Sequence, residues 1–133
     1  MNKINQTGFA LYFVLLASVV LTILAICNVQ ADEPEILDAK AEVQANSLYA
    51  FSVTLKHPDA GWSHYADGWD ILDLNGKKIE TRTLYHPHAN NEPFTRSLAN
   101  VKIPIGMNFV SIRANCSVDG PAQKLYRLEL PPR

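Results

Sequence analysis

Apolar and polar residues alternate along residues 48–57, which form the clearest strand pattern in the chain. Successive side chains of a strand point to opposite faces, so the alternation predicts one buried and one exposed face. The predicted buried side chains are Tyr49, Phe51, Val53 and Leu55. A similar alternation over residues 37–43 predicts a preceding strand with Leu37, Ala39, Ala41 and Val43 on one face.

Five further segments have the length and residue types of strands, and turn residues separate them. They are residues 69–74, 78–85, 94–98, 109–116 and 125–130. Asn75-Gly76 lies between the first two and favours a type I′ hairpin, whose two central residues both need positive φ. We therefore predict one antiparallel β-sandwich of about seven strands over residues 36–130, immunoglobulin/fibronectin-like, with Trp69 in its core. The cysteine pair of antibody domains is absent, which favours the fibronectin-like version.

An unbroken apolar run over residues 9–26 follows a polar start with one positive side chain, Lys3. Together with the small-x-small pattern that ends at Ala31, this run predicts a signal peptide over residues 1–31. Residues 32–35 are then expected to form a flexible lead-in to the domain. The sequence thus predicts a periplasmic or secreted protein.

Two alternatives to cleavage after Ala31 stay open. Residues 9–26 are long enough to remain as a membrane anchor at the N-terminus. Cys27 is a candidate for lipoprotein processing, although Ile26 is bulkier than the residue that such signals prefer before the cysteine. Both alternatives still place the domain outside the cytoplasm.

The charge balance argues against two classes of partner. Without residues 1–31 the chain carries 11 basic and 13 acidic side chains, a net charge of −2. It has no basic patch, so we expect no nucleic-acid partner and no binding to anionic lipid. Contact with a membrane is expected only through residues 9–26, if they are not cleaved.

Cys116 is the only cysteine after residue 31, so the domain cannot contain an internal disulfide. Its phase in the strand over 109–116 favours a buried, small apolar side chain. No local motif supports a Cys–His nucleophile. A copper thiolate ligand and an intermolecular disulfide remain as alternatives.

All four histidines lie between residues 57 and 88. His86 and His88 flank a proline, and on an extended chain positions i and i+2 point the same way, so two imidazoles can converge on one ion. We predict a copper or zinc site made by His86 and His88 together with His57 or His64. The alternative is that these residues only shape turns.

Residues 58–68 form a long, aromatic-rich loop, and such loops on rigid scaffolds often carry function. Trp62 and Tyr65 are candidates for a surface that binds a peptide, a glycan or an extracytoplasmic protein partner, with Asp67 beside them. The interpretation favoured by the sequence is a small satellite core under the loop.

Arg96 shares the strand phase of two apolar neighbours, Phe94 and Leu98. It is expected to form a partly buried ion pair with a carboxylate such as Asp70 or Glu80. Anion binding by Arg96 is the alternative.

Four motifs within about residues 57–120 resemble a family of small exported bacterial proteins of uncharacterised function. They are GW-x-HYAD-x-W over 61–69, HPH over 86–88, PFTRSL over 93–98 and V-x-I-R-A-x-x-S-V-x-G over 110–120. The resemblance implies a periplasmic or secreted β-sandwich and carries no known activity. It also implies Asp at the position of Cys116, which argues against an essential thiol.

Taken together, these features predict an exported, non-catalytic binding domain. Copper or zinc is the expected ligand, and an interaction module built on the loop 58–68 is the alternative. The sequence shows neither a nucleophile motif nor paired acids of the kind that hydrolysis requires, so no enzymatic activity is predicted.

Overall fold

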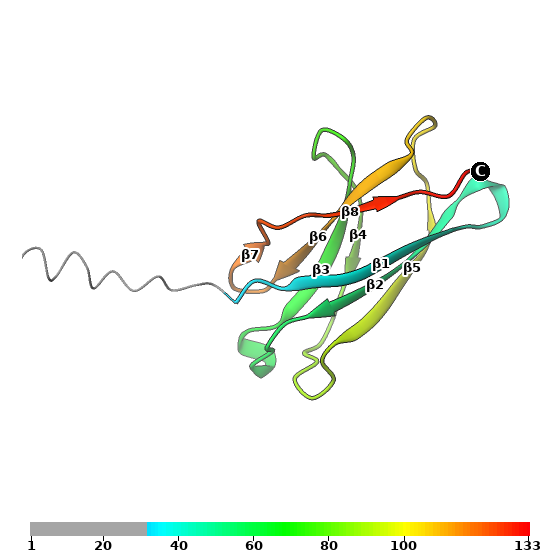
Figure 1. Ribbon diagram of the computed structural model, residues 1–133. Coiled ribbons are helices and arrows are strands. Elements are labelled where there is room, and N and C mark those ends of the chain that lie inside the picture. The colour runs from blue at the N-terminus through cyan, green and yellow to red at the C-terminus, as the bar shows by residue number, and fades with distance from the viewer. Residues whose placement is uncertain (1–31) are drawn as a thin grey trace, which may run out of the picture. The chain divides into compact units, whose positions relative to one another are not determined.

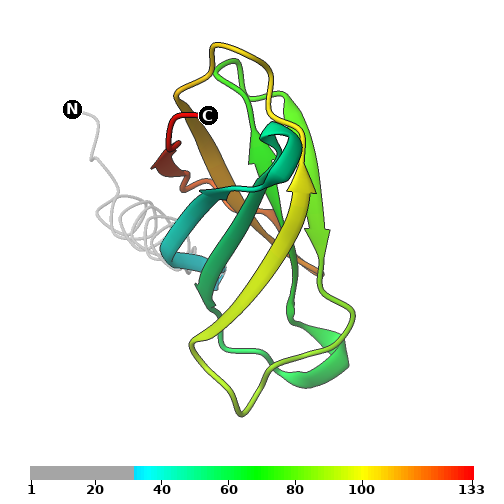
Figure 2. The ribbon, with the colours of Figure 1, turned by 90° about the vertical axis from the view of Figure 1, so that its right-hand side faces the viewer.

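The computed structural model describes residues 32–133, which form two antiparallel β-sheets (Figures 1 and 2). The predicted signal peptide over residues 1–31, with its apolar run 9–26 and Cys27, lies outside the described residues. Within the described part, no helix has the length and apolar character needed to cross a membrane. The expectation of an all-β sandwich is confirmed.

The smaller sheet has three strands in the order β1-β2-β5. These are β1 (Glu35–Val43), β2 (Tyr49–Lys56) and β5 (Phe94–Val101). A 3-10 turn, η1 (Ala45–Ser47), connects β1 to β2. Strand β1 begins at Glu35, and Pro34 just before it is buried.

The larger sheet has the order β4-β3-β6-β7, and β8 pairs with β6 as well. Its strands are β3 (Ala66–Leu72), β4 (Lys78–Thr83), β6 (Phe109–Cys116), β7 (Gly120–Pro121) and β8 (Tyr126–Glu129). A second 3-10 turn, η2 (Gly61–Ser63), lies in the long loop before β3. Strand β4 pairs with β3 and not with β5, which differs from constant-type immunoglobulin domains, where the fourth and fifth strands share a sheet.

The core lies between the two sheets and follows the predicted alternation. Tyr49, Phe51, Val53 and Leu55 are all buried, as expected for the inner face of β2. Trp69 of β3 is fully buried, which confirms its predicted place. The opposing sheet contributes Val110, Ile112 and Ala114 from β6.

Strand β1 departs from the predicted alternation because it contains an irregularity. Its pairing with β2 shifts between Ile36 and Asp38, which leaves Leu37 without a cross-strand partner. Ile36 is therefore buried, whereas Leu37, predicted on the inner face, is 44% exposed. One extra residue in a strand reverses the facing of every residue before it.

The hairpin between β3 and β4 is present, but it is not the predicted type I′ turn. Gly76 has a φ of 78°, whereas Asn75 does not have a positive φ. The Asp73 carboxylate instead accepts hydrogen bonds from the backbone N–H groups of Asn75 and Lys77, both at 2.8 Å. This local bonding by an Asp side chain stabilises a turn that needs only one residue with positive φ.

Gly68 brings β3 and β4 into close contact, and Gly68→Ala is expected to lower the free energy of unfolding by about 1–3 kcal/mol. A Cβ atom at this position would lie 2.8 Å from the carbonyl oxygen of Arg82, so the backbone of one strand must move. Urea denaturation measures the effect. Gly61→Ala is the control, because there a Cβ meets no atom within 4 Å and only the φ of 78° opposes it. A smaller loss for Gly68→Ala than for Gly61→Ala would contradict the close contact.

Candidate metal centre

One end of the sandwich gathers three potential metal ligands from separate parts of the chain. His57 directly follows β2, His64 lies between η2 and β3, and Cys116 is the last residue of β6. Ala66 at the start of β3 pairs with Cys116, and Ser117 N–H donates to the carbonyl of Tyr65 at 3.0 Å. This register places His64, two residues before Ala66, beside the end of β6.

The side chains of His57, His64 and Cys116 converge, and we refer to them as the converging group. One ligand atom from each lies within 4.8 Å of the ligand atoms of the other two. His57 and Cys116 are buried, whereas the His64 side chain is 28% exposed. Two imidazoles and a thiol at this spacing can hold a metal ion.

Asp59 orients His57. Its Oδ1 lies 2.6 Å from His57 Nδ1, and a carboxylate can only accept, so Nδ1 carries the proton. The Nε2 atom of His57 therefore has a free lone pair, and it is buried without a hydrogen-bond partner in the described structure. A carboxylate on one ring nitrogen and a free lone pair on the other is the usual arrangement of a metal-binding histidine.

The Asp59 carboxylate also joins three segments of the chain. Oδ1 accepts the N–H of Ala66 at 2.9 Å, and Oδ2 accepts the N–H of His88 at 2.6 Å. Burial alone would raise the pKa of Asp59, but the hydrogen bonds from His57 and from these two backbone groups outweigh it, and the pKa is lowered. Asp59 is therefore ionised at neutral pH.

His64 has a carboxylate partner of its own. Its Nε2 lies 3.1 Å from Asp119 Oδ2, so this carboxylate engages one nitrogen of the ring. Cys116 Sγ lies 3.6 Å from the same oxygen and accepts the N–H of Val118 at 3.5 Å. A carboxylate thus engages one nitrogen of each histidine in the converging group, and a backbone donor points at the sulfur.

His86 and His88 lie at the same end of the sandwich but outside the converging group. His88 is buried and stacks on Phe94, with ring centroids 3.8 Å apart. Its pKa is lowered, first by burial and then by the charges of Arg96 and His86. His86 is exposed, and its ring centroid lies 4.7 Å from that of His88. Of the four predicted histidine ligands, the structure brings His57 and His64 together with Cys116.

Cys116 was expected to be a buried, small apolar side chain, and it is buried, but its sulfur faces the two histidines. The sequence contains one indication that Cys116 lies near the histidines. In an antiparallel sandwich, successive strands run in opposite directions, so the second and sixth strands end on the same side. His57 and Cys116 are both strand-end residues in that arrangement.

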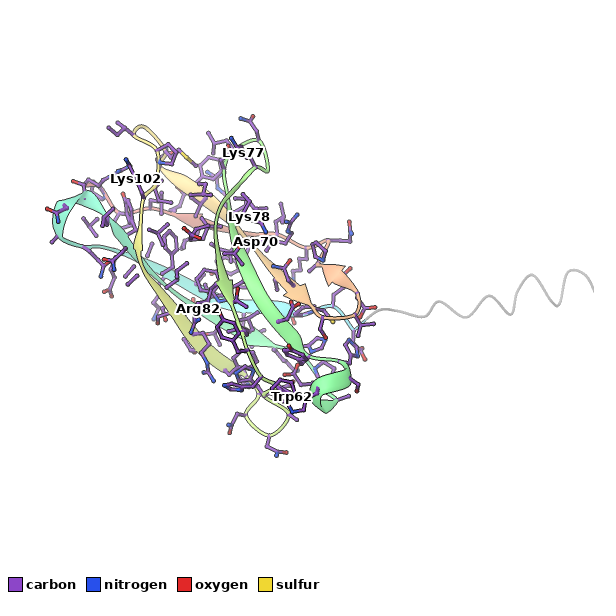
Figure 3. The ribbon with its side chains drawn as sticks, turned by 180° about the vertical axis from the view of Figure 1, so that it is seen from behind. Trp62, Asp70, Lys77, Lys78, Arg82 and Lys102 are labelled. Carbon is purple, nitrogen blue, oxygen red and sulfur yellow. The ribbon has the colours of Figure 1, made fainter. Side chains whose placement is uncertain are left out.

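Trp62 is not part of a satellite core, contrary to the favoured interpretation of its loop. It is 71% exposed and packs edge-on against the half-buried Tyr65, with ring centroids 6.0 Å apart. Trp62 is the middle residue of η2, and Figure 3 shows it at the end of the sandwich. Asp67 is half-buried in β3, and burial raises its pKa.

Arg96 does not form the expected ion pair with Asp70 or Glu80. It lies on β5 in the three-stranded sheet, whereas Asp70 lies on β3 of the other sheet. The Arg96 guanidinium donates to the carbonyl of Thr95 and sits 5.3 Å from the centroid of the Phe94 ring. Asp70 pairs instead with Arg113 at 2.9 Å and with Lys78 at 3.1 Å. Figure 3 shows Asp70 beside Lys78.

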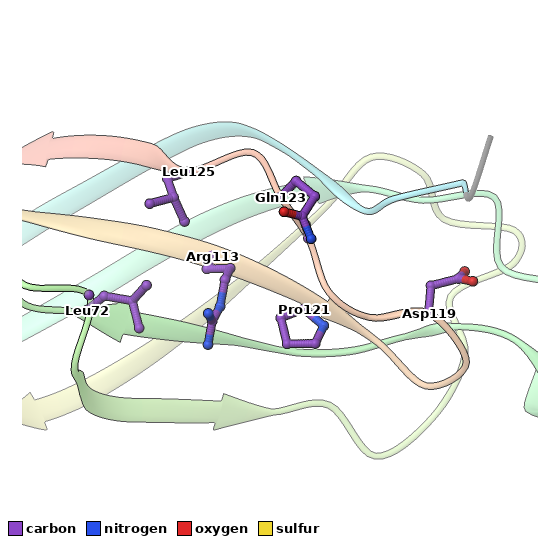
Figure 4. Close-up of a pocket in the computed structure, with 8 residues that line it drawn as sticks. Leu72, Arg113, Asp119, Pro121, Gln123 and Leu125 are labelled. Carbon is purple, nitrogen blue, oxygen red and sulfur yellow. The ribbon is translucent and has the colours of Figure 1, made fainter. Parts of the chain in front are cut away.

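A shallow hollow of about 490 Å³ lies on the five-stranded sheet, between β3, β6 and the segment that leads through β7 to β8. Its lining includes Leu72, Arg113, Asp119, Pro121, Gln123 and Leu125 (Figure 4). A second hollow of about 330 Å³ shares Arg113 and Pro121 with it and reaches Cys116. Cys116 belongs to the converging group, and Asp119 contacts both His64 and Cys116, so the two hollows border this group.

Comparisons with known proteins give one partial match. The chain is 34% identical over 88 residues to a protein of Halomicrobium mukohataei named "Putative lipoprotein". The match covers 66% of this chain and 43% of that protein, so the chain spans less than half the length of this relative. No protein-family model and no solved structure matches.

Proposed function

We propose that this protein is an exported metal-binding domain that holds copper or zinc through His57, His64 and Cys116. The observation that carries the proposal is the convergence of these three side chains within 4.8 Å. Two carboxylates support it, because Asp59 and Asp119 each engage one nitrogen of a histidine and so orient its ring. The Nε2 atom of His57 is buried without a hydrogen-bond partner in the described structure, and a bound metal ion would supply the missing partner.

Export is supported by two independent observations. Residues 1–31 have the pattern of a signal peptide, and the relative from Halomicrobium mukohataei is named "Putative lipoprotein". Both fit a domain that works outside the cytoplasm, either released or held at a membrane by its N-terminal segment. Metal ions from the surroundings would reach it there.

Binding requires neutral imidazoles and a thiolate, so metal affinity should fall as the pH drops below about 6. The resemblance of the sequence implies Asp at the position of Cys116, and a carboxylate is also a zinc ligand. A metal site built on the two histidines is therefore compatible with either residue.

The ligand set is tested by native mass spectrometry and competition titration with copper and zinc. The wild-type protein is expected to bind one ion per chain. His57→Ala and Cys116→Ser should weaken binding by at least about 100-fold, because each removes a direct ligand.

His86→Ala is the matched control for these titrations. His86 is an exposed histidine at the same end of the sandwich, and it lies outside the converging group. Its replacement should leave the affinity unchanged. Loss of binding in His86→Ala together with normal binding in His57→Ala would instead favour the His86–His88 pair. No binding by the wild-type protein would end the proposal.

The second candidate function is an interaction module, and the exposed Trp62 favours it. A large aromatic side chain that is 71% exposed and supported by Tyr65 is suited to stacking on a sugar ring or an apolar peptide side chain. Trp62→Ala would leave metal affinity unchanged and remove such binding, so the two functions can be measured separately on one variant.

A further inference from the structure

We propose that the metal in the converging group is copper and that the site exchanges single electrons with an external carrier. This inference rests on the proposed metal-binding function and names its metal and its chemistry. It is drawn from the identity of the three ligands, from how firmly they are held and from the exposure of one of them.

The ligands favour copper. Two imidazole nitrogens and one thiolate form the trigonal set that proteins use for electron-transfer copper, whereas structural zinc is almost always four-coordinate. Within residues 32–133 the converging group has three members. An oxygen beside the group, Asp119 Oδ2, is already engaged by His64 Nε2 at 3.1 Å. Copper(II) also binds more tightly than zinc to a given set of nitrogen and sulfur ligands.

The three ligands are held in place by the fold itself. Cys116 pairs with Ala66 on one side and Gly120 on the other, so its backbone is fixed by two neighbouring strands. His57 is held by Asp59, whose carboxylate accepts three hydrogen bonds. A ligand set that is fixed in this way cannot rearrange between the geometries that copper(I) and copper(II) prefer. The ligands therefore reorganise little when an electron is transferred.

His64 is the ligand through which electrons can pass. The side chains of His57 and Cys116 are buried, whereas that of His64 is 28% exposed. Its backbone is anchored as well, because Ala60 N–H donates to the His64 carbonyl at 2.8 Å and His64 N–H donates to the Gly61 carbonyl at 3.2 Å. The His64 imidazole therefore reaches the surface while the other two side chains of the converging group stay buried.

The reaction is an outer-sphere transfer of one electron. Copper(II) in the site gains one electron and becomes copper(I), while a reduced one-electron carrier loses one electron and leaves in its oxidised form. No bond forms or breaks in the protein, and no proton moves. The reverse transfer to an oxidised carrier restores copper(II).

The experiment uses the full chain, purified in the form that an exporting host produces, and titrates it with copper(II). The wild-type protein should develop an intense visible thiolate-to-copper(II) absorption that saturates at one equivalent. Ascorbate should bleach it with one electron per copper, and ferricyanide should restore it over repeated cycles. Cys116→Ser should lose the absorption, and His86→Ala should keep it.

Cys116→Ser would also lose the absorption if it misfolded, so a second variant is tested. His64→Ala replaces a partly exposed side chain outside the apolar core, and it should keep the thiolate absorption but shift its maximum. Copper binding without the visible absorption, or loss of the thiol to a disulfide-linked dimer on the first copper(II) addition, would overturn the inference. If either of these outcomes is found and the protein still binds zinc, the proposed metal site is kept and only the copper chemistry is rejected. If the protein binds no metal, both proposals are rejected.

Discussion

Asp59→Asn is expected to lower the free energy of unfolding by about 3 kcal/mol, because the side chain is a fully buried acceptor with three donors. These donors are His57 Nδ1–H, Ala66 N–H and His88 N–H. An amide keeps one acceptor oxygen and presents an NH₂ group to at least one of the donors. The unpaired donors then lose their hydrogen bonds without gaining water. Urea denaturation measures the change.

Asp38→Asn is the matched control, because the Asp38 side chain is 52% exposed and its contact with Lys40 is long, at 3.8 Å. That variant should change the free energy of unfolding by no more than about 0.5 kcal/mol. Equal effects of the two substitutions would show that the Asp59 hydrogen bonds do not stabilise the fold.

Asp59→Asn should also weaken metal binding by about 10–100-fold, measured where the variant is still folded. Asp59 is a positioning residue, since its carboxylate contacts His57 and is not a member of the converging group. It keeps the proton of His57 on Nδ1 and so keeps the lone pair on Nε2. Asp59→Glu, which retains the charge, should recover part of the affinity, and a purely structural role for Asp59 would give no such recovery.

Asp70→Ala is expected to lower the free energy of unfolding by about 3 kcal/mol. Asp70 is 1% exposed on the outer face of β3, where Oδ1 accepts from Thr81 Oγ1 at 2.6 Å and Oδ2 accepts from Arg113 at 2.9 Å. Lys78 adds a third partner at 3.1 Å. Removing the carboxylate leaves the partly buried Arg113 guanidinium without its counter-charge. Thermal and urea denaturation at pH 7 both report the loss.

The stabilisation by Asp70 should depend on pH with a defined sign. Burial alone would raise the pKa of Asp70, but the hydrogen bonds from Thr81, Arg113 and Lys78 outweigh it and lower the pKa. A carboxyl group with a lowered folded pKa contributes its full stabilisation above the unfolded pKa of about 3.9. That contribution is lost as the pH falls through the folded pKa.

Wild type should therefore lose stability below about pH 4, and Asp70→Ala should lose less over the same range. Unfolding midpoints between about pH 2 and pH 7 give both curves. Because Asp59 also has a lowered pKa, some acid sensitivity should remain in Asp70→Ala. Identical slopes for the two proteins would contradict the role of Asp70.

The sequence by itself determined the class of fold and most of its strands. The alternation in β2 places Tyr49, Phe51 and Leu55 in the core, because the period of two admits only one set of inward-facing residues. Strand β6 was predicted with the bounds that the structure has. Where a local irregularity intervened, as at Leu37, the period alone gave the wrong face, because an inserted residue leaves no separate mark in the pattern.

Only the tertiary structure decided which side chains form the candidate site. Spacing along the chain drew attention to His86 and His88, which are two residues apart, whereas Cys116 is 59 positions beyond His57. The pairing of Ala66 with Cys116 brings that sulfur to the histidines, and the reach of Asp59 to His88 sets the packing around them. Contacts of this kind depend on the register and closure of two sheets. Local sequence patterns carry strand identity, but they do not carry the long-range pairing that brings strand ends together.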